Sequence, residues 1–167
     1  MVKLPLNSVS IVVFILFLVT SCNEVKNKET SINSEQNKVA FISTMEKHLD
    51  AVTNRDLETL RSTMSPNGNM QLILPSTEII NKVDGFMKYH EDWFSDPSWT
   101  FETKILNTEI GEFMGMAIVE IVYREPDRDG GPYFNRMIVS YDLQKIKGQW
   151  YIIKDHASSV EKSTDKK

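Results

Sequence analysis

The sequence predicts an α+β domain in which helices come first along the chain and an antiparallel sheet follows. Apolar residues before position 95 recur mostly at the three- and four-residue spacing of helices. From Trp99 onward the period changes to two, which is typical of strands with one buried face. Helices that precede such a sheet are expected to pack on one of its faces, which is the α+β arrangement.

Three helices are expected before the sheet. The first ends near Thr53, and Asp56 is the expected N-cap of the second, which stops before Pro66. A short strand in "NMQLILP" separates them from a third helix in "EIINKVDGFMKYHEDWF", which Gly85 weakens somewhat. The apolar sides consist of Phe41, Met45, Leu49 and Val52 on the first helix, and of Val83, Phe86, Met87, His90 and Phe94 on the third.

Four long strands follow, in "SWTFETKILNTEIG", "MGMAIVEIVYRE", "PYFNRMIVSYDLQKI" and "QWYIIKDHASS". The last two are joined by a tight turn at Gly148, and "EPDRDGGPY" is a longer hairpin loop. On each strand, residues of one parity are apolar and are expected to face the helices. These rows are Trp99, Phe101 and Ile105; Ala117, Val119, Ile121 and Tyr123; Met137, Val139, Tyr141 and Leu143; and Tyr151, Ile153, Asp155 and Ala157.

Asp155 and His156 stand side by side on the last strand, so they point to opposite faces of the sheet. This adjacency argues against a catalytic Asp–His pair. Asp155 is expected to face the helices, with Trp150, Ile152, Lys154 and His156 on the mixed outer face, which could meet water or a second subunit. The assignment is conditional, because a β-bulge would shift the phase by one residue.

The first 21 residues have the pattern of a secretory signal. Lys3 gives a positive start, and the apolar run from Val9 to Val19 has the length of a signal-peptide core. It ends in "LVTSC", which resembles the lipobox of bacterial lipoproteins and places Cys22, the sole cysteine, where the lipid would be attached. An ordinary secretory signal or an N-terminal membrane anchor with an incidental cysteine are the alternatives.

The lipobox resemblance implies a protein held in the bacterial cell envelope by acyl chains, such as palmitate, on Cys22. Asn23 stands where an Asp would resemble the inner-membrane retention signal, which favours the outer membrane. Residues 22–37 are polar and are expected to form a tether, and 161–167 a disordered tail. The folded domain is therefore expected at 38–160.

Several classes of function are disfavoured by composition. The formal net charge is −4 and no basic stripe is visible, so nucleic-acid binding is not expected. The three histidines, His48, His90 and His156, have no metal-ligand spacing, and no Gly-rich phosphate loop is present. The sequence therefore predicts neither a metal site nor a cofactor.

The order of elements and the closing stretch "GQWYIIKDHASS" resemble the nuclear transport factor 2-like superfamily, and within it the SnoaL-like domains. The resemblance rests on the closing pattern Arg-x-Thr, Gly-x-Trp, His-x-Ser, which matches here at Arg136, Gly148, Trp150, His156 and Ser158. Ile138 replaces the Thr of that pattern. The association domain of calcium/calmodulin-dependent kinase closes in a similar way.

The resemblance implies a cone, in which a strongly curved sheet wraps three helices around a pocket. Members of this superfamily include isomerases, polyketide cyclases, dehydratases, epoxide hydrolases and proteins that only bind or oligomerise, so the fold carries no single reaction. The carboxylate–Tyr–acid arrangement of ketosteroid isomerases and the Asp-Arg-Asp arrangement of the epoxide hydrolases have no recognisable counterparts in this chain, which argues against enzymatic activity.

Asp155 is the leading candidate for the pocket, because a carboxyl group in an apolar cavity has a raised pKa and can act as an acid or base. His90, Trp93, Tyr123 and Tyr141 are the further pocket candidates, although a histidine or an aromatic residue at such a position is more often part of the core. Arg136, His156 and Ser158 are expected to serve structure or a dimer contact on the outer face.

The sequence thus favours a membrane-anchored lipoprotein whose single domain binds a small, largely apolar molecule, with Asp155, His90 and Tyr123 as polar contacts. One alternative is an isomerase, dehydratase or cyclase that uses the same pocket, with Asp155 as base. The other is an interaction module that pairs into a homodimer through the outer sheet face.

Overall fold

The computed structural model describes residues 34–163. The signal peptide and Cys22 therefore lie outside the described residues, as do most of the predicted tether and the last four residues of the tail. Residues 34–37, assigned to the tether, are helical, and residues 161–162, assigned to the tail, are in a strand. Within the described part, no helix is both long and apolar enough to cross a bilayer.

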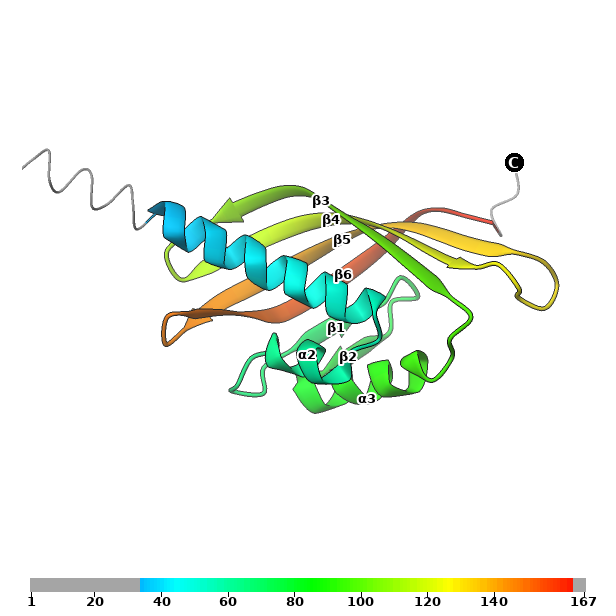
Figure 1. The fold of residues 1–167 in the computed structure, drawn as a ribbon, viewed down its shortest axis with the longest axis horizontal. Coiled ribbons are helices and arrows are strands. Elements are labelled where there is room, and N and C mark those ends of the chain that lie inside the picture. Colours follow the sequence, from blue (N-terminus) through cyan, green and yellow to red (C-terminus); the bar gives the residue numbers. More distant parts are fainter. Residues whose placement is uncertain (1–33, 164–167) are drawn as a thin grey trace, which may run out of the picture. The chain divides into compact units, whose positions relative to one another are not determined.

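The helices precede the four long strands, as predicted (Figure 1). A helix over residues 34–53 leads into α2 (Leu57–Ser62), and α3 (Lys82–Phe94) follows the first two strands. Asp56 is the N-cap of α2, since its side chain accepts a hydrogen bond from the Thr59 backbone N–H at 3.0 Å. The expectation of an α+β fold with helices on one face of a curved sheet is confirmed.

The sheet has six strands in the order β2-β1-β6-β5-β4-β3. The four long strands β3 (Thr100–Ile110), β4 (Met114–Glu125), β5 (Tyr133–Ile146) and β6 (Gln149–Lys162) form the predicted antiparallel meander. The short strand β1 (Gln71–Ile73) pairs parallel to β6, so the sheet is mixed. Lys147 and Gly148 both have positive φ, as the tight β5–β6 turn requires.

The start of the third helix was predicted incorrectly. Ile79–Asn81 form strand β2, which pairs antiparallel with β1, and α3 begins only at Lys82. Two adjacent isoleucines favour a strand, and Lys82 has a φ of 64°, which a right-handed helix cannot continue through. Gly85 lets α3 approach β2 closely, because a Cβ there would lie 3.1 Å from Ile80 Cγ2.

The predicted inward rows are confirmed on β3, β4 and β5 but only in part on β6. Trp150 and Ile152, which were expected to face outward, are buried, whereas Tyr151 and Ile153 are half-buried. The register explains the error, since Asp142 pairs with Lys154 while the next residue, Leu143, pairs with Ile152. Ile153 is thus the extra residue of a β-bulge, beyond which Asp155 and Ala157 face inward as predicted.

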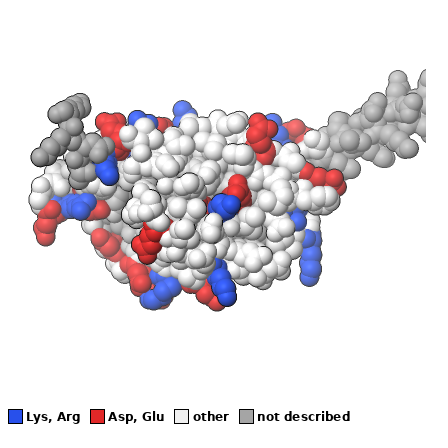
Figure 2. Space-filling view, turned by 180° about the vertical axis from the view of Figure 1, so that it is seen from behind, with Lys and Arg blue, Asp and Glu red and all other residues white. Residues whose placement is uncertain are grey.

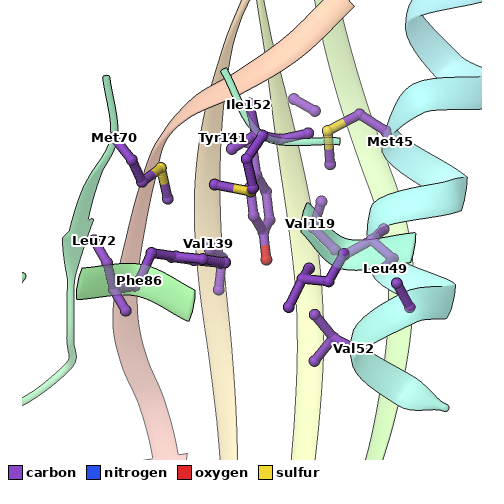
Figure 3. Packing of buried hydrophobic residues seen from close by; sticks show 14 of the residues in the cluster. Met45, Leu49, Val52, Met70, Leu72, Phe86, Val119, Val139, Tyr141 and Ile152 are labelled. Carbon is purple, nitrogen blue, oxygen red and sulfur yellow. The ribbon is translucent and has the colours of Figure 1, made fainter. Parts of the chain in front are cut away.

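The core lies between the first helix, α2, α3 and the inner face of the sheet (Figure 3). Phe41 of the first helix packs edge-on against Trp150 of β6, with ring centroids 5.2 Å apart. Met45, Leu49 and Val52 continue this contact along the helix toward β4 and β5. Phe86 brings α3 into the same cluster, so the first helix and α3 share one core.

Candidate functional site

A cavity of about 390 Å³ opens between α3 and the inner face of the sheet, and we call it the Asp155 pocket. Its walls come from every long strand, from β1 and the residues after it, and from α3. The lining consists of Leu72, Leu74, Pro75, Tyr89, His90, Trp93, Phe101, Tyr123, Glu125, Arg128, Tyr133, Asn135, Met137, Asp155 and Ala157. A mostly apolar and aromatic wall with a few polar groups is typical of small-molecule sites.

Asp155 lies in this wall with only 8% of its surface exposed. Among the described residues its carboxyl group has no hydrogen-bond or ion-pair partner, and burial alone raises its pKa to about 7. Its neighbour across the strands is Tyr141, and the pKa of Tyr89 on α3 is raised first by burial and then by the nearby Asp155 charge. Asp155 can therefore be protonated or ionised near neutral pH.

His90 stands in the same wall, held by its own helix. Its Nδ1 lies 2.9 Å from the Phe86 carbonyl oxygen, which can only accept, so Nδ1 carries the proton. Burial lowers the pKa of His90 to about 4, and the ring is neutral at pH 7. In that tautomer Nε2 is the remaining acceptor of the ring, on a residue that lines the cavity.

Of the other pocket candidates, Trp93 and Tyr123 lie in the wall of this cavity, whereas Tyr141 does not. Trp93 stacks on Trp99 with ring centroids 4.3 Å apart, which fixes its orientation. The Tyr123 hydroxyl donates to Glu125 Oε1 at 2.8 Å, and burial is the main cause that raises its pKa. Tyr141 is instead buried in the core beside His48, with ring centroids 5.5 Å apart.

His48 has a structural environment. It is fully buried, and its Nδ1 lies 2.8 Å from Thr63 Oγ1, which itself donates to the Leu60 carbonyl oxygen. The Thr63 hydroxyl proton is therefore used, and His48 must be the donor in their contact. Burial, followed by the charge of His90, lowers the pKa of His48 to about 3, so this residue is a neutral part of the core.

The mouth of the pocket contains residues that the sequence analysis did not single out. Glu125 ends β4, Arg128 lies in the following loop, and Tyr133 begins β5. Arg128 sits over the Tyr133 ring at 4.5 Å and forms an ion pair with Glu125 at 3.6 Å. A hairpin loop rich in Asp and Gly gives no periodic signal, so only the folded hairpin reveals that this loop borders the cavity.

Arg136, His156 and Ser158 lie on the outer face of the sheet, where they make different contacts. Arg136 forms ion pairs with Glu120 at 3.2 Å and with Glu161 at 3.7 Å. His156 and Ser158 are exposed, and His156 is paired across the strands with Ser140. Seen from behind the view of Figure 1, acidic and basic side chains are interspersed and neither sign forms a continuous patch (Figure 2).

No metal-binding group emerges from the described part of the chain, in which no three His, Cys, Asp or Glu side chains are placed to hold an ion.

The buried carboxyl group makes a testable prediction about stability and pH. Because the folded-state pKa of Asp155 is raised from 3.8 to about 7, its ionisation destabilises the fold as pH rises through this interval. Asp155→Asn should therefore gain stability relative to the wild type between pH 4 and pH 7, by as much as ~4 kcal/mol, and the gain should level off above pH 7. Urea unfolding of the full chain at a series of pH values measures this difference.

The outer-face variant Asp142→Asn is the matched control, because Asp142 is partly exposed and forms an ion pair with Lys154 at 3.4 Å. Its stability difference from the wild type should not increase across the same interval. A pH-independent difference for Asp155→Asn would show that this carboxyl group ionises normally in the folded protein.

Both the sequence and the fold are similar to those of known proteins. The model of the SnoaL-like domain family matches residues 30–161. No curated protein matches the chain. Among solved structures, a dehydratase of the nuclear transport factor 2-like family from Streptomyces avermitilis is similar, with a TM-score of 0.66 and 12% identity, covering 76% of this chain and 99% of that one.

Two further structures have the same fold. A type 2 hexachlorocyclohexane dehydrochlorinase gives a TM-score of 0.69 at 10% identity, with 80% of this chain and 91% of that chain covered. The association domain of the Caenorhabditis elegans calcium/calmodulin-dependent kinase II gives 0.56 at 20% identity, with 74% and 96% covered. At such identities the likeness concerns the fold, while the family model covers most of the chain. The chain thus belongs to the SnoaL-like domain family, and its fold is that of the nuclear transport factor 2-like structures.

Proposed function

We propose that this protein binds a small, largely apolar molecule in the Asp155 pocket. The observation that carries the proposal is a cavity of about 390 Å³ whose wall combines aromatic rings with a buried carboxyl group that lacks a partner among the described residues. This volume lies in the range of small-molecule sites. Burying an unpaired carboxyl group costs stability, and a bound ligand that satisfies the group offsets that cost.

A second candidate function, proton transfer on the bound molecule, is favoured by the raised pKa of Asp155. A carboxyl group with a pKa of about 7 is well matched to take up and return a proton at neutral pH. Neutral His90, in the same wall, supplies an acceptor that could orient the molecule. The dehydratase and the hexachlorocyclohexane dehydrochlorinase with the same fold are named for eliminations, reactions in which removal of a proton from carbon is an ordinary step.

We also propose attachment to the cell envelope through Cys22 and pairing into a homodimer. Acylation of Cys22 would hold the domain on the outer membrane, with the residues that follow as its tether. Homodimerisation through the outer sheet face stays a prediction, for which the likeness to an oligomer-forming type of domain, the kinase association domain, gives general support.

Filling the pocket tests the binding proposal. Leu74→Trp places a larger side chain in the wall, so small molecules that co-purify with the wild type should be depleted at least about tenfold in the variant, because their space is taken. The full chain is purified in detergent, and mass spectrometry of its organic extract measures the bound molecules. Ala157→Ile, at another point of the wall, should give the same result if Leu74→Trp does not fold.

The exposed position Val160 provides the control, since Val160→Trp adds a similar ring outside the cavity. An extract that is equally rich in all folded variants, or a wild-type extract without any specific molecule, would count against binding in this pocket.

Deuterium incorporation distinguishes catalysis from binding alone. If Asp155 acts as a base, the captured molecule should gain deuterium from heavy water in the presence of wild-type protein. Asp155→Asn should reduce the rate by about a hundredfold or more, because an amide cannot take up the proton. Mass spectrometry measures the exchange, with Asp142→Asn as control. Binding without exchange by the wild type would rule out this mode of proton transfer.

Replacement of the cysteine tests the membrane anchor. Cys22→Ala removes the thiol that would carry the acyl chains, so cells grown with a labelled fatty acid should incorporate the label into the wild-type protein and not into this variant. Asn23→Ala, one residue further along, should keep the label and serves as control. A wild-type protein without label, or a Cys22→Ala protein labelled as strongly as the wild type, would refute lipid attachment at this residue.

A further inference from the structure

The charged side chains that line the Asp155 pocket indicate which charge its ligand carries. Two of its lining residues, Asp155 and Glu125, carry carboxyl groups, and one, Arg128, is cationic. The Arg128 guanidinium is already engaged by the Tyr133 ring and by Glu125. Asp155, by contrast, has no cationic partner among the described residues. The pocket wall therefore contains a carboxyl group that the protein itself does not neutralise.

The remaining wall is suited to a positive charge as well. Five aromatic residues line the cavity, namely Tyr89, Trp93, Phe101, Tyr123 and Tyr133. The faces of such rings attract cations, most strongly where water is excluded. The molecule already uses this attraction nearby, since the Arg55 guanidinium lies 3.8 Å from the centroid of Trp99, on which Trp93 stacks.

The neutral polar groups of the wall also favour a ligand that donates hydrogen bonds. His90 keeps its proton on Nδ1 for the Phe86 carbonyl oxygen, which leaves Nε2 as an acceptor. The Tyr123 hydroxyl proton is given to Glu125. The polar groups whose hydrogen bonds can be assigned thus accept rather than donate toward a ligand, and a ligand that donates satisfies both Asp155 and His90.

From the unpaired buried Asp155 carboxyl group and the aromatic wall around it, we propose that the ligand carries a protonated amine on an apolar body. The ammonium group pairs with Asp155, and the apolar body packs against the rings of α3, β3 and β4. This inference rests on the proposed binding function of the pocket and specifies the class of its ligand. A neutral molecule of the same shape offers the carboxylate at most a hydrogen bond, and an anionic one is repelled by it, so both bind more weakly than the ammonium.

A matched pair of probes tests the proposal. 2-Naphthylmethylamine and 2-naphthylmethanol have nearly the same shape, but only the amine is charged at pH 8, where Asp155 is mostly ionised. Isothermal titration calorimetry of the full chain in detergent should show the amine binding at least about tenfold more tightly than the alcohol. In Asp155→Asn the two affinities should come within about twofold of each other, while Asp142→Asn should retain the wild-type preference.

The outcomes separate this inference from the binding proposal beneath it. If the alcohol binds wild-type protein as tightly as the amine, and Leu74→Trp abolishes both, the pocket binds small molecules but not by their charge, and the inference fails alone. If the preference for the amine survives in Asp155→Asn, the inference is also overturned. If neither probe binds the folded wild-type protein at millimolar concentration, the inference and this use of the pocket fail together.

Discussion

The bulge at Ile153 is the constraint on which the arrangement of core and pocket depends. One strand, β6, has to serve two neighbours: its first half packs against the helix over residues 34–53, and its second half forms part of the cavity wall. A regular strand could not place both Ile152 and Asp155 on the inner face, since they are three residues apart. The extra residue allows both, so the same strand closes the core and opens the pocket.

The pocket contains a buried acid that the described residues leave without a partner. In the core, His48 is held by Thr63 through Nδ1 although its Nε2 has no partner, whereas the Asp155 carboxyl group in the cavity has neither a hydrogen bond nor an ion pair among the described residues. Sequences usually avoid this, because an unpaired buried acid reduces stability. The fold tolerates it beside a tightly packed aromatic cluster, of which Trp93 and Trp99 are the stacked centre. Binding and reaction sites commonly combine such a destabilising polar group with rigidly packed neighbours.

Much of this arrangement could be predicted from residue order alone. Alternation on β3, β4 and β5 identified the inner rows, because side-chain parity is fixed wherever a strand stays regular. The resemblance of the closing stretch identified the fold, and together they placed Asp155 inside. Parity failed at Trp150 and Ile152, because a bulge arises from the curvature of the whole sheet and leaves no signature in "QWYIIKDH". Strand β2 was missed because Ile79 and Ile80 fit a helical pattern as well as a strand.

The cavity residues differ in how far they could be predicted, because some lie on regular elements and others lie in or beside a loop. Residues on regular elements, such as His90 and Trp93, follow from helical spacing. Tyr141 faces the helices as its parity predicts but lies in the core, and only the folded structure shows that Tyr89 lines the cavity instead. The wall also includes Glu125, Arg128 and Tyr133, which belong to the ends of a hairpin and its loop. Such a loop can change in length or composition without repacking the interior. The mouth of the cavity can thus diversify independently of its base, so that one inherited scaffold can acquire new selectivity at little structural risk.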